Sequence, residues 1–111
     1  MSDLNELREH LASLKKVVAL GEQVERLKLN NDFNEIIVKG FCDEEMKRCM
    51  SLAVCEKLQQ EQRELANNMA KASAALTNYL YTILRNANIA REDIADVQDA
   101  ILELETKGED E

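Results

Sequence analysis

The sequence LANNMAKASAALTNYLYTILRNANIAREDIADVQDAILEL, residues 65–104, decides the fold of this chain. Its apolar residues recur at steps of three or four, the spacing that places side chains on one face of an α-helix. From Leu80 to Leu104 the steps alternate three and four without exception, as in a heptad repeat. The stretch predicts a long helix with an apolar seam formed by Leu65, Met69, Ala72, Leu76, Leu80, Ile83, Ala87, Ala90, Ile94, Val97, Ile101 and Leu104.

The composition favours helices throughout the 111 residues. Proline is absent and glycine occurs three times, whereas proline breaks helix interiors and sheet-rich domains need glycine in their turns. We therefore predict an all-α fold, a helical hairpin or bundle with one long C-terminal helix at about 58–106. An N-terminal helix at about 3–29 and two short helices at about 33–39 and 43–55 would pack against it. Residues 1–107 would form a single helical domain and 108–111 an acidic, disordered tail.

Two glycines lie at informative positions. Gly21 falls inside the predicted N-terminal helix, whose apolar face would consist of Leu4, Leu7, Leu11, Leu14 and Val18. Close packing against another helix explains Gly21 best, and a hinge is the alternative. Gly40 follows a predicted short helix that Asp32 and Glu35 would begin as a capping box. There glycine would adopt the left-handed conformation that ends a helix.

The net charge of −8 is unevenly distributed along the chain. Residues 91–111 hold nine acidic and two basic residues, a net of −7, and residues 1–90 have a net of −1. No basic patch suited to phosphates is present, which disfavours direct binding to nucleic acid or to an anionic membrane. The apolar runs are far shorter than a membrane span, and the first residues do not resemble a signal peptide.

The residues with reactive side chains do not form a recognisable site. Cys42, Cys49 and Cys55 are separated by seven and six residues, whereas structural zinc sites usually pair cysteines two to four residues apart. We interpret them as reduced cysteines of a packed helix. His10 is the only histidine, and a nucleophile pair with Cys42 or Cys49 has no local support. We predict no catalytic, cofactor-binding or metal-binding residues, and no enzyme.

The lengths of the helices suggest an interface. A helix of residues 58–106 would be about 70 Å long and one of residues 3–29 about 40 Å. The N-terminal helix therefore cannot cover the whole seam of the C-terminal helix, although the short middle helices can cover some more. We expect residues 65–84 to pack within the chain, with Tyr79 in the core and Tyr81 on the surface or in an interface. Part of the remaining seam would stay open for a partner, and the expected interface residues are Ala87, Ala90, Ile94, Val97, Ile101 and Leu104.

Two segments resemble a known group of proteins. Residues 32–41, DFNEIIVKGF, are followed by the acidic residues Asp43, Glu44 and Glu45, and residues 74–80 read AALTNYL. Segments like these, in this order and after a leucine-rich helix, are similar to those of small helical proteins encoded by tailed bacteriophages. The resemblance covers most of residues 11–95. It implies a phage product but supplies no catalytic or binding residues, and the cysteines and the acidic tail depart from its pattern.

These observations lead to two expectations about function. The first is a phage structural or assembly protein, virion-associated or of the scaffolding type, that acts through helix–helix self-association. The second is an acidic phage regulator that binds and inhibits a host protein, with its carboxylates imitating the phosphates of DNA. The expected partners are further copies of the chain or other phage or host proteins, without a cofactor. The expected location is the host cytoplasm or the virion.

Overall fold

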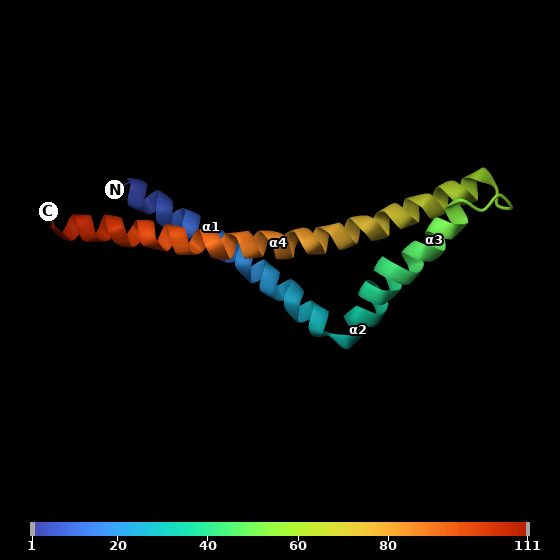
Figure 1. Ribbon diagram of the computed structural model, residues 1–111, viewed down its shortest axis with the longest axis horizontal. Helices are drawn as coiled ribbons and strands as arrows, with labels where there is room; N and C mark the ends of the chain where they lie inside the picture. Colours follow the sequence, from blue (N-terminus) through green and yellow to red (C-terminus); the bar gives the residue numbers. More distant parts are fainter. Residues whose placement is uncertain (1, 111) are drawn as a thin grey trace. The chain divides into compact units, whose positions relative to one another are not determined.

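The computed structural model describes residues 2–110, which form an all-α fold as predicted (Figure 1). Within these residues there is no strand. A long C-terminal helix packs against the N-terminal helix and against a shorter helix. The elements are α1 (Ser2–Leu29), α2 (Asn31–Phe33), the π-helix η1 (Asn34–Glu45), α3 (Met46–Ala53) and α4 (Gln60–Asp110).

The long helix α4 begins slightly later and ends later than the sequence predicts. It starts at Gln60, after a connection formed by residues 54–59, and continues through Asp110. The predicted tail is therefore helical as far as Asp110, and Glu111 lies outside the described residues. A glycine such as Gly108 costs a helix only about 1 kcal/mol unless it adopts the left-handed conformation, and none of the described glycines has a positive φ.

The prediction of two separate short helices was wrong, because α2, η1 and α3 follow one another without a break. Gly40 does not end a helix, since its φ is not positive. It lies inside η1, where hydrogen bonds span five residues and widen the helix. A Cβ added at Gly40 would lie 3.0 Å from the carbonyl oxygen of Glu35, five residues earlier. This close approach, and not a left-handed turn, makes glycine suitable there.

The cap at the start of this middle segment is also different from the predicted one. The side chain of Asn30 accepts a hydrogen bond of 2.9 Å from the backbone N–H of Phe33. Asn30 has an extended backbone conformation, as a residue at the N-terminal cap of a helix should. Asp32, which the sequence suggested as the cap, instead lies within the first turn of α2.

The contacts within the chain divide it into two compact units. Unit 1 comprises residues 1–24 and 83–111, and unit 2 comprises residues 25–82. The helix α4 contributes to both units, whereas α2, η1 and α3 belong to unit 2 only. The single domain predicted for residues 1–107 therefore has two separate sets of contacts.

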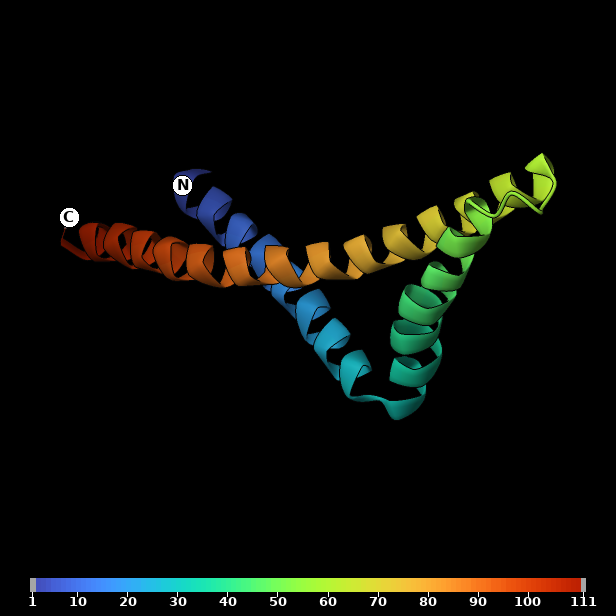
Figure 2. The ribbon, with the colours of Figure 1, turned by 45° about the vertical axis from the view of Figure 1, so that its right-hand side comes forward.

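Unit 1 is an antiparallel pair formed by α1 and the second half of α4, with both chain ends at the same end of the pair (Figures 1 and 2). Near that end, Arg8 forms an ion pair of 2.9 Å with Glu105. The predicted apolar face of α1 is half-buried along its length, at Leu4, Leu7, Leu11, Leu14 and Val18.

Helices α1 and α4 pack closely in unit 1 where Gly21 meets Ala87. Gly21 is buried, and Ala87 is 0% exposed. A Cβ added at Gly21 would overlap the Cβ of Ala87. Close packing, and not a hinge, is therefore the reason for glycine at this position.

Unit 2 contains a smaller core in which α3 packs against the first turns of α4. Its buried residues are Cys49 from α3 and Ala66 and Ala70 from α4. Met46, Leu52 and Ala53 of α3 are partly buried against them. Because the buried residues of α4 are small, the two helices approach each other closely without needing large side chains between them.

The Gly21–Ala87 contact predicts the effect of a single methyl group. Gly21→Ala should lower the free energy of unfolding by about 1–2 kcal/mol, since overpacking outweighs the gain in helix propensity. Gly108→Ala is the matched control, because nothing lies within 4 Å of a Cβ added at Gly108, and it should not destabilise the chain. The double variant Gly21→Ala/Ala87→Gly should recover most of the loss. Urea unfolding followed by circular dichroism measures all three, and a Gly21→Ala protein as stable as the parent would contradict this packing.

Candidate helix interaction surface

The seam predicted as an interface is partly covered within the chain itself. Ala87, Ala90 and Val97 are buried, and Ile94, Ile101 and Leu104 are half-buried. They lie in unit 1, where α1 packs against this half of α4. The expectation of an open surface is therefore wrong for Ala87, Ala90 and Val97, whereas Ile94, Ile101 and Leu104 keep part of their surface exposed.

The order of the elements explains why the wrong half of the seam was expected to be open. A connection of six residues, 54–59, joins α3 to α4. Such a short connection keeps consecutive helices adjacent, so α3 packs on the start of α4. The helix α1 pairs with the second half instead. The argument from helix lengths correctly indicates that α1 is too short to cover α4, but it does not indicate which half α1 covers.

An apolar surface is exposed on the first half of α4, where packing inside the chain was expected. Leu65 is 65% exposed, Tyr79 is 60% exposed, and Met69 is 40% exposed. Ala72 is exposed and Leu76 is half-buried. The prediction of a core position for Tyr79 was wrong, whereas Tyr81 lies on the surface, as expected. We call the surface formed by Leu65, Met69, Ala72, Leu76 and Tyr79 the α4 stripe.

The α4 stripe and the buried face of α4 lie side by side on the helix. The buried residues of this part are Ala66, Ala70 and Ser73. With 3.6 residues per turn, each residue advances by about 100°, so these three residues and the stripe point about 100° apart. Ala66 and Ala70 pack against α3, and the larger apolar residues beside them do not. Successive residues of the stripe are separated alternately by four and three positions in the sequence, which is the spacing of a helix-pairing seam.

The surroundings of the stripe contain little charge. Lys71 is the only charged residue between positions 65 and 79. It lies about 120° from the middle of the stripe at the same step per residue. An uncharged strip of this kind is suited to another apolar helix and does not attract a charged ligand.

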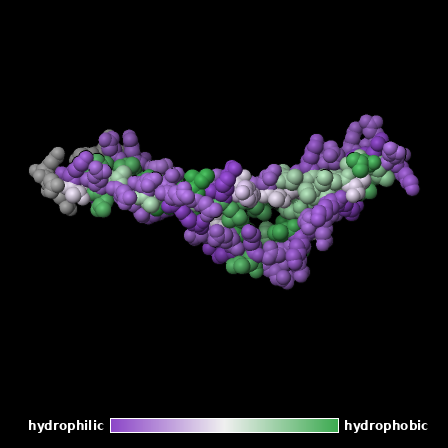
Figure 3. All heavy atoms as spheres, viewed as in Figure 1, coloured by the Kyte–Doolittle hydropathy of each residue, from purple (hydrophilic) through white to green (hydrophobic). Residues whose placement is uncertain are grey.

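Exposed apolar side chains are concentrated in unit 2. Of the twelve large apolar residues that are exposed among the described residues, nine belong to unit 2. Figure 3 shows the apolar atoms gathered over the first half of α4, whereas the second half is mainly hydrophilic on the same face. The three exposed large apolar residues of unit 1 are Leu20, Ile89 and Leu102.

The net charge has the opposite distribution. Residues 1–24 and 83–111, which form unit 1, hold thirteen acidic and six basic residues, a net of −7. Residues 25–82, which form unit 2, have a net of −1. The two units therefore differ in kind, because one is strongly acidic and the other is nearly neutral with an exposed apolar surface.

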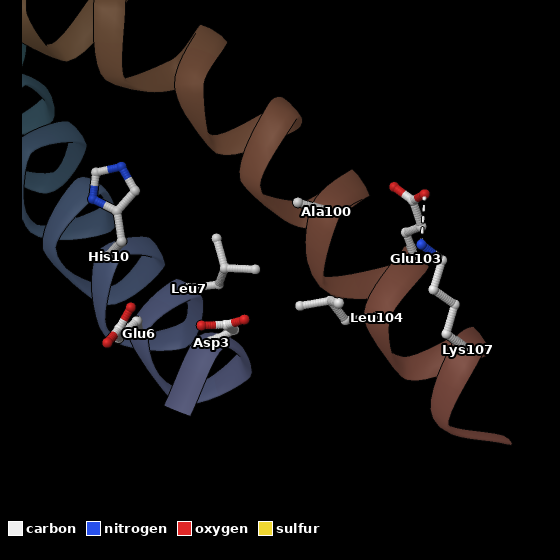
Figure 4. Close-up of a pocket in the computed structure, with 8 residues that line it drawn as sticks. All are labelled: Asp3, Glu6, Leu7, His10, Ala100, Glu103, Leu104 and Lys107. Carbon is white, nitrogen blue, oxygen red and sulfur yellow. Dashed lines mark ion pairs between the residues drawn. The ribbon is translucent and has the colours of Figure 1, made fainter. Parts of the chain in front are cut away.

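A shallow groove lies in unit 1 between the first turns of α1 and the last turns of α4 (Figure 4). Its volume is about 560 Å³, and Leu7 and Leu104 point toward each other across it. Glu103 forms an ion pair of 3.6 Å with Lys107. His10 is exposed at its edge, and the groove contains no cysteine or hydroxyl that could act with His10 as a nucleophile. The remaining lining residues are Asp3, Glu6 and Ala100.

The cysteines and the histidine belong to different units. His10 lies in unit 1, and Cys42, Cys49 and Cys55 lie in unit 2 with free thiols. The Cys49 thiol is 1% exposed, and its sulfur lies 3.6 Å from Oε1 of Glu45. Burial raises the pKa of the Cys49 thiol, and the hydrogen bond to Glu45 raises it further. A thiol of this kind is a poor nucleophile.

Glu45 is itself paired with Arg48, one turn along the helix. The Nε of Arg48 donates a hydrogen bond of 3.0 Å to Oε2 of Glu45. This bond lowers the pKa of the Glu45 carboxyl and raises the pKa of Arg48. The arrangement is an ordinary helix ion pair beside the core of unit 2. The described residues contain no group of three or more potential metal ligands.

Comparison with known proteins gives no further assignment, since the chain matches no protein family, no curated protein and no solved structure. None of the helices in the described part of the chain is long and apolar enough to cross a membrane. The α4 stripe is thus the feature with the clearest consequence for function.

The burial of Cys49 predicts its reactivity. In the folded protein at pH 8, Cys42 and Cys55 should react with a disulfide reagent well before Cys49, because Cys49 is inaccessible and forms less thiolate at a given pH when its pKa is raised. Unfolding in urea should make all three react at similar rates. Cys49→Ala is the control and should remove only the slow phase. Rapid labelling of Cys49 in the folded protein, located by mass spectrometry, would contradict the described core of unit 2.

Proposed function

We propose that this chain is an assembly protein of a tailed bacteriophage that acts through self-association of its helices, as a scaffolding-type or virion-associated protein. The observation that carries the proposal is the α4 stripe, an exposed apolar surface with the spacing of a helix-pairing seam. A large exposed apolar strip costs solubility unless a partner covers it. The phage setting comes from the resemblance of residues 32–45 and 74–80, and the location follows from it as the host cytoplasm or the virion.

The proposed action is contact between helices and not catalysis. Burying the side chains of the α4 stripe would lower the free energy by about 25 cal/mol per Å² of apolar surface removed from water. The acidic residues of unit 1 would keep the assembled protein soluble and prevent contact at other places. Attraction in one unit and repulsion in the other suit a protein that assembles to a limited size.

A second candidate is the acidic regulator that binds a host protein by imitating DNA. The observation in its favour is the net charge of −7 in unit 1. Its exposed carboxylates on α4 include Glu92, Asp93, Asp96 and Asp99. A basic host protein could bind this surface by charge, but that function leaves the α4 stripe without a role, so we place it second.

Self-association predicts unequal effects of two matched substitutions. Leu65→Glu and Leu102→Glu each place one carboxylate on α4, at leucines that are 65% and 62% exposed. The first should weaken association at least about tenfold, because burying a leucine contributes roughly 1.5–3 kcal/mol. The second should leave it unchanged. Sedimentation velocity over a range of concentrations makes the comparison, and a parent protein that stays monomeric at high concentration would refute the proposal.

The two candidate functions differ in where the chain should be found during infection. An assembly protein should be present in purified virions or in procapsids, with a fixed number of copies per particle. A regulator should occur only in the soluble fraction of infected cells. Quantitative mass spectrometry of both fractions decides between them. A major capsid protein measured in the same samples is the control. Absence of this chain from every particle intermediate would count against an assembly role.

A further inference from the structure

We propose that the occupant of the α4 stripe is a second copy of this chain, and that the two α4 helices run antiparallel along it. This inference rests on the proposed self-association and deepens it, since it names the partner surface and its orientation. The stripe of one copy would pack against the same stripe of the other. Such a pairing has two-fold symmetry and is closed, because each copy uses the same residues.

The distribution of charge restricts where two copies can meet. Two copies in contact through unit 1 would bring two net charges of −7 together. Contact through unit 2 brings together two charges of −1, and the stripe itself contains no charged residue. Like charges at an interface oppose association. Unit 2 is therefore the part of the chain through which a second copy can approach at the lowest electrostatic cost.

The residues of the stripe complement themselves in size. Ala72 lies in the middle of the stripe, between Met69 and Leu76, and Leu65 and Tyr79 lie at its two ends. A small residue in the middle lets two helices approach closely, while larger residues at the ends fill the space where the helices diverge. In an antiparallel pair the leucine end of one copy meets the tyrosine end of the other. The Tyr79 hydroxyl can then remain at the wet edge of the interface.

Charges at the start of α4 favour the antiparallel orientation. Glu61 and Glu64 precede the stripe and are exposed. In a parallel pair each glutamate would lie beside the same glutamate of the other copy, at an interhelical distance of about 8–10 Å. In an antiparallel pair centred near Ala72 the two copies of Glu61 would lie about 30 Å apart along the axis. That separation is several times the Debye length of about 8 Å at physiological ionic strength, so their repulsion is screened.

Cross-linking between introduced cysteines tests the orientation directly. The background is Cys42→Ser/Cys55→Ser, with Cys49 retained because it is 1% exposed. Leu65→Cys and Tyr79→Cys are made separately, one of them with a mass tag, and treated with a short bismaleimide alone and as a mixture. We expect a cross-linked heterodimer in the mixture and little product from either variant alone. Leu102→Cys, mixed with either variant, measures the background from random collisions.

Each other outcome overturns a defined part of the inference. Strong cross-linking of Leu65→Cys to itself would show a parallel pair and refute the antiparallel orientation. Association by sedimentation without cross-linking above the Leu102→Cys background would show that another surface joins the copies. In both cases self-association would stand. A monomer in every sample would refute the proposed function as well as this inference, so the two failures are distinguishable.

Discussion

The contact between Gly21 and Ala87 determines which surfaces of this chain are free. Because neither residue has a side chain larger than a methyl group, α1 lies directly on the second half of α4. Packing of α1 along this half of α4 buries Ala87, Ala90 and Val97 and covers part of the seam in unit 1. In unit 2, α3 packs against the small residues Ala66 and Ala70 of the first half of α4. The larger apolar residues of the α4 stripe lie beside that buried face and stay exposed.

The sequence predicts the helices well because their signal is local. Steps of three and four residues, the absence of proline and the leucines of α1 suffice for the all-α fold and for its long C-terminal helix. The sequence does not predict the middle segment correctly, because Gly40 is compatible both with a helix end and with a helix interior. Only the approach of the Glu35 carbonyl distinguishes them. A π-helix such as η1 has no sequence signal that could be weighed against an α-helix beforehand.

The sequence predicts an exposed apolar strip on α4 but assigns it to the wrong half of the helix. Alternating large and small apolar residues on α4 leave two possible inward faces, one of leucine and methionine and one of alanine and serine. Hydropathy favours the first, whereas the structure buries Ala66, Ala70 and Ser73 and leaves Leu65 and Met69 exposed. The choice depends on how closely α3 can approach, which is a tertiary property. For the same reason the sequence placed the open seam at Ala87–Leu104, the half that α1 covers.

The separation of charge from apolar surface bears on how assembly would stop. A chain whose apolar surface lay in both units could join further copies without limit, since each added copy would offer a new free surface. Here the large exposed apolar residues lie mostly in unit 2 and the net charge almost entirely in unit 1. A symmetric pair through the α4 stripe would cover Leu65, Met69 and Tyr79 of these residues and would leave the two acidic units in water. Further contact through the acidic units would require a partner that neutralises their carboxylates, such as a different, basic protein.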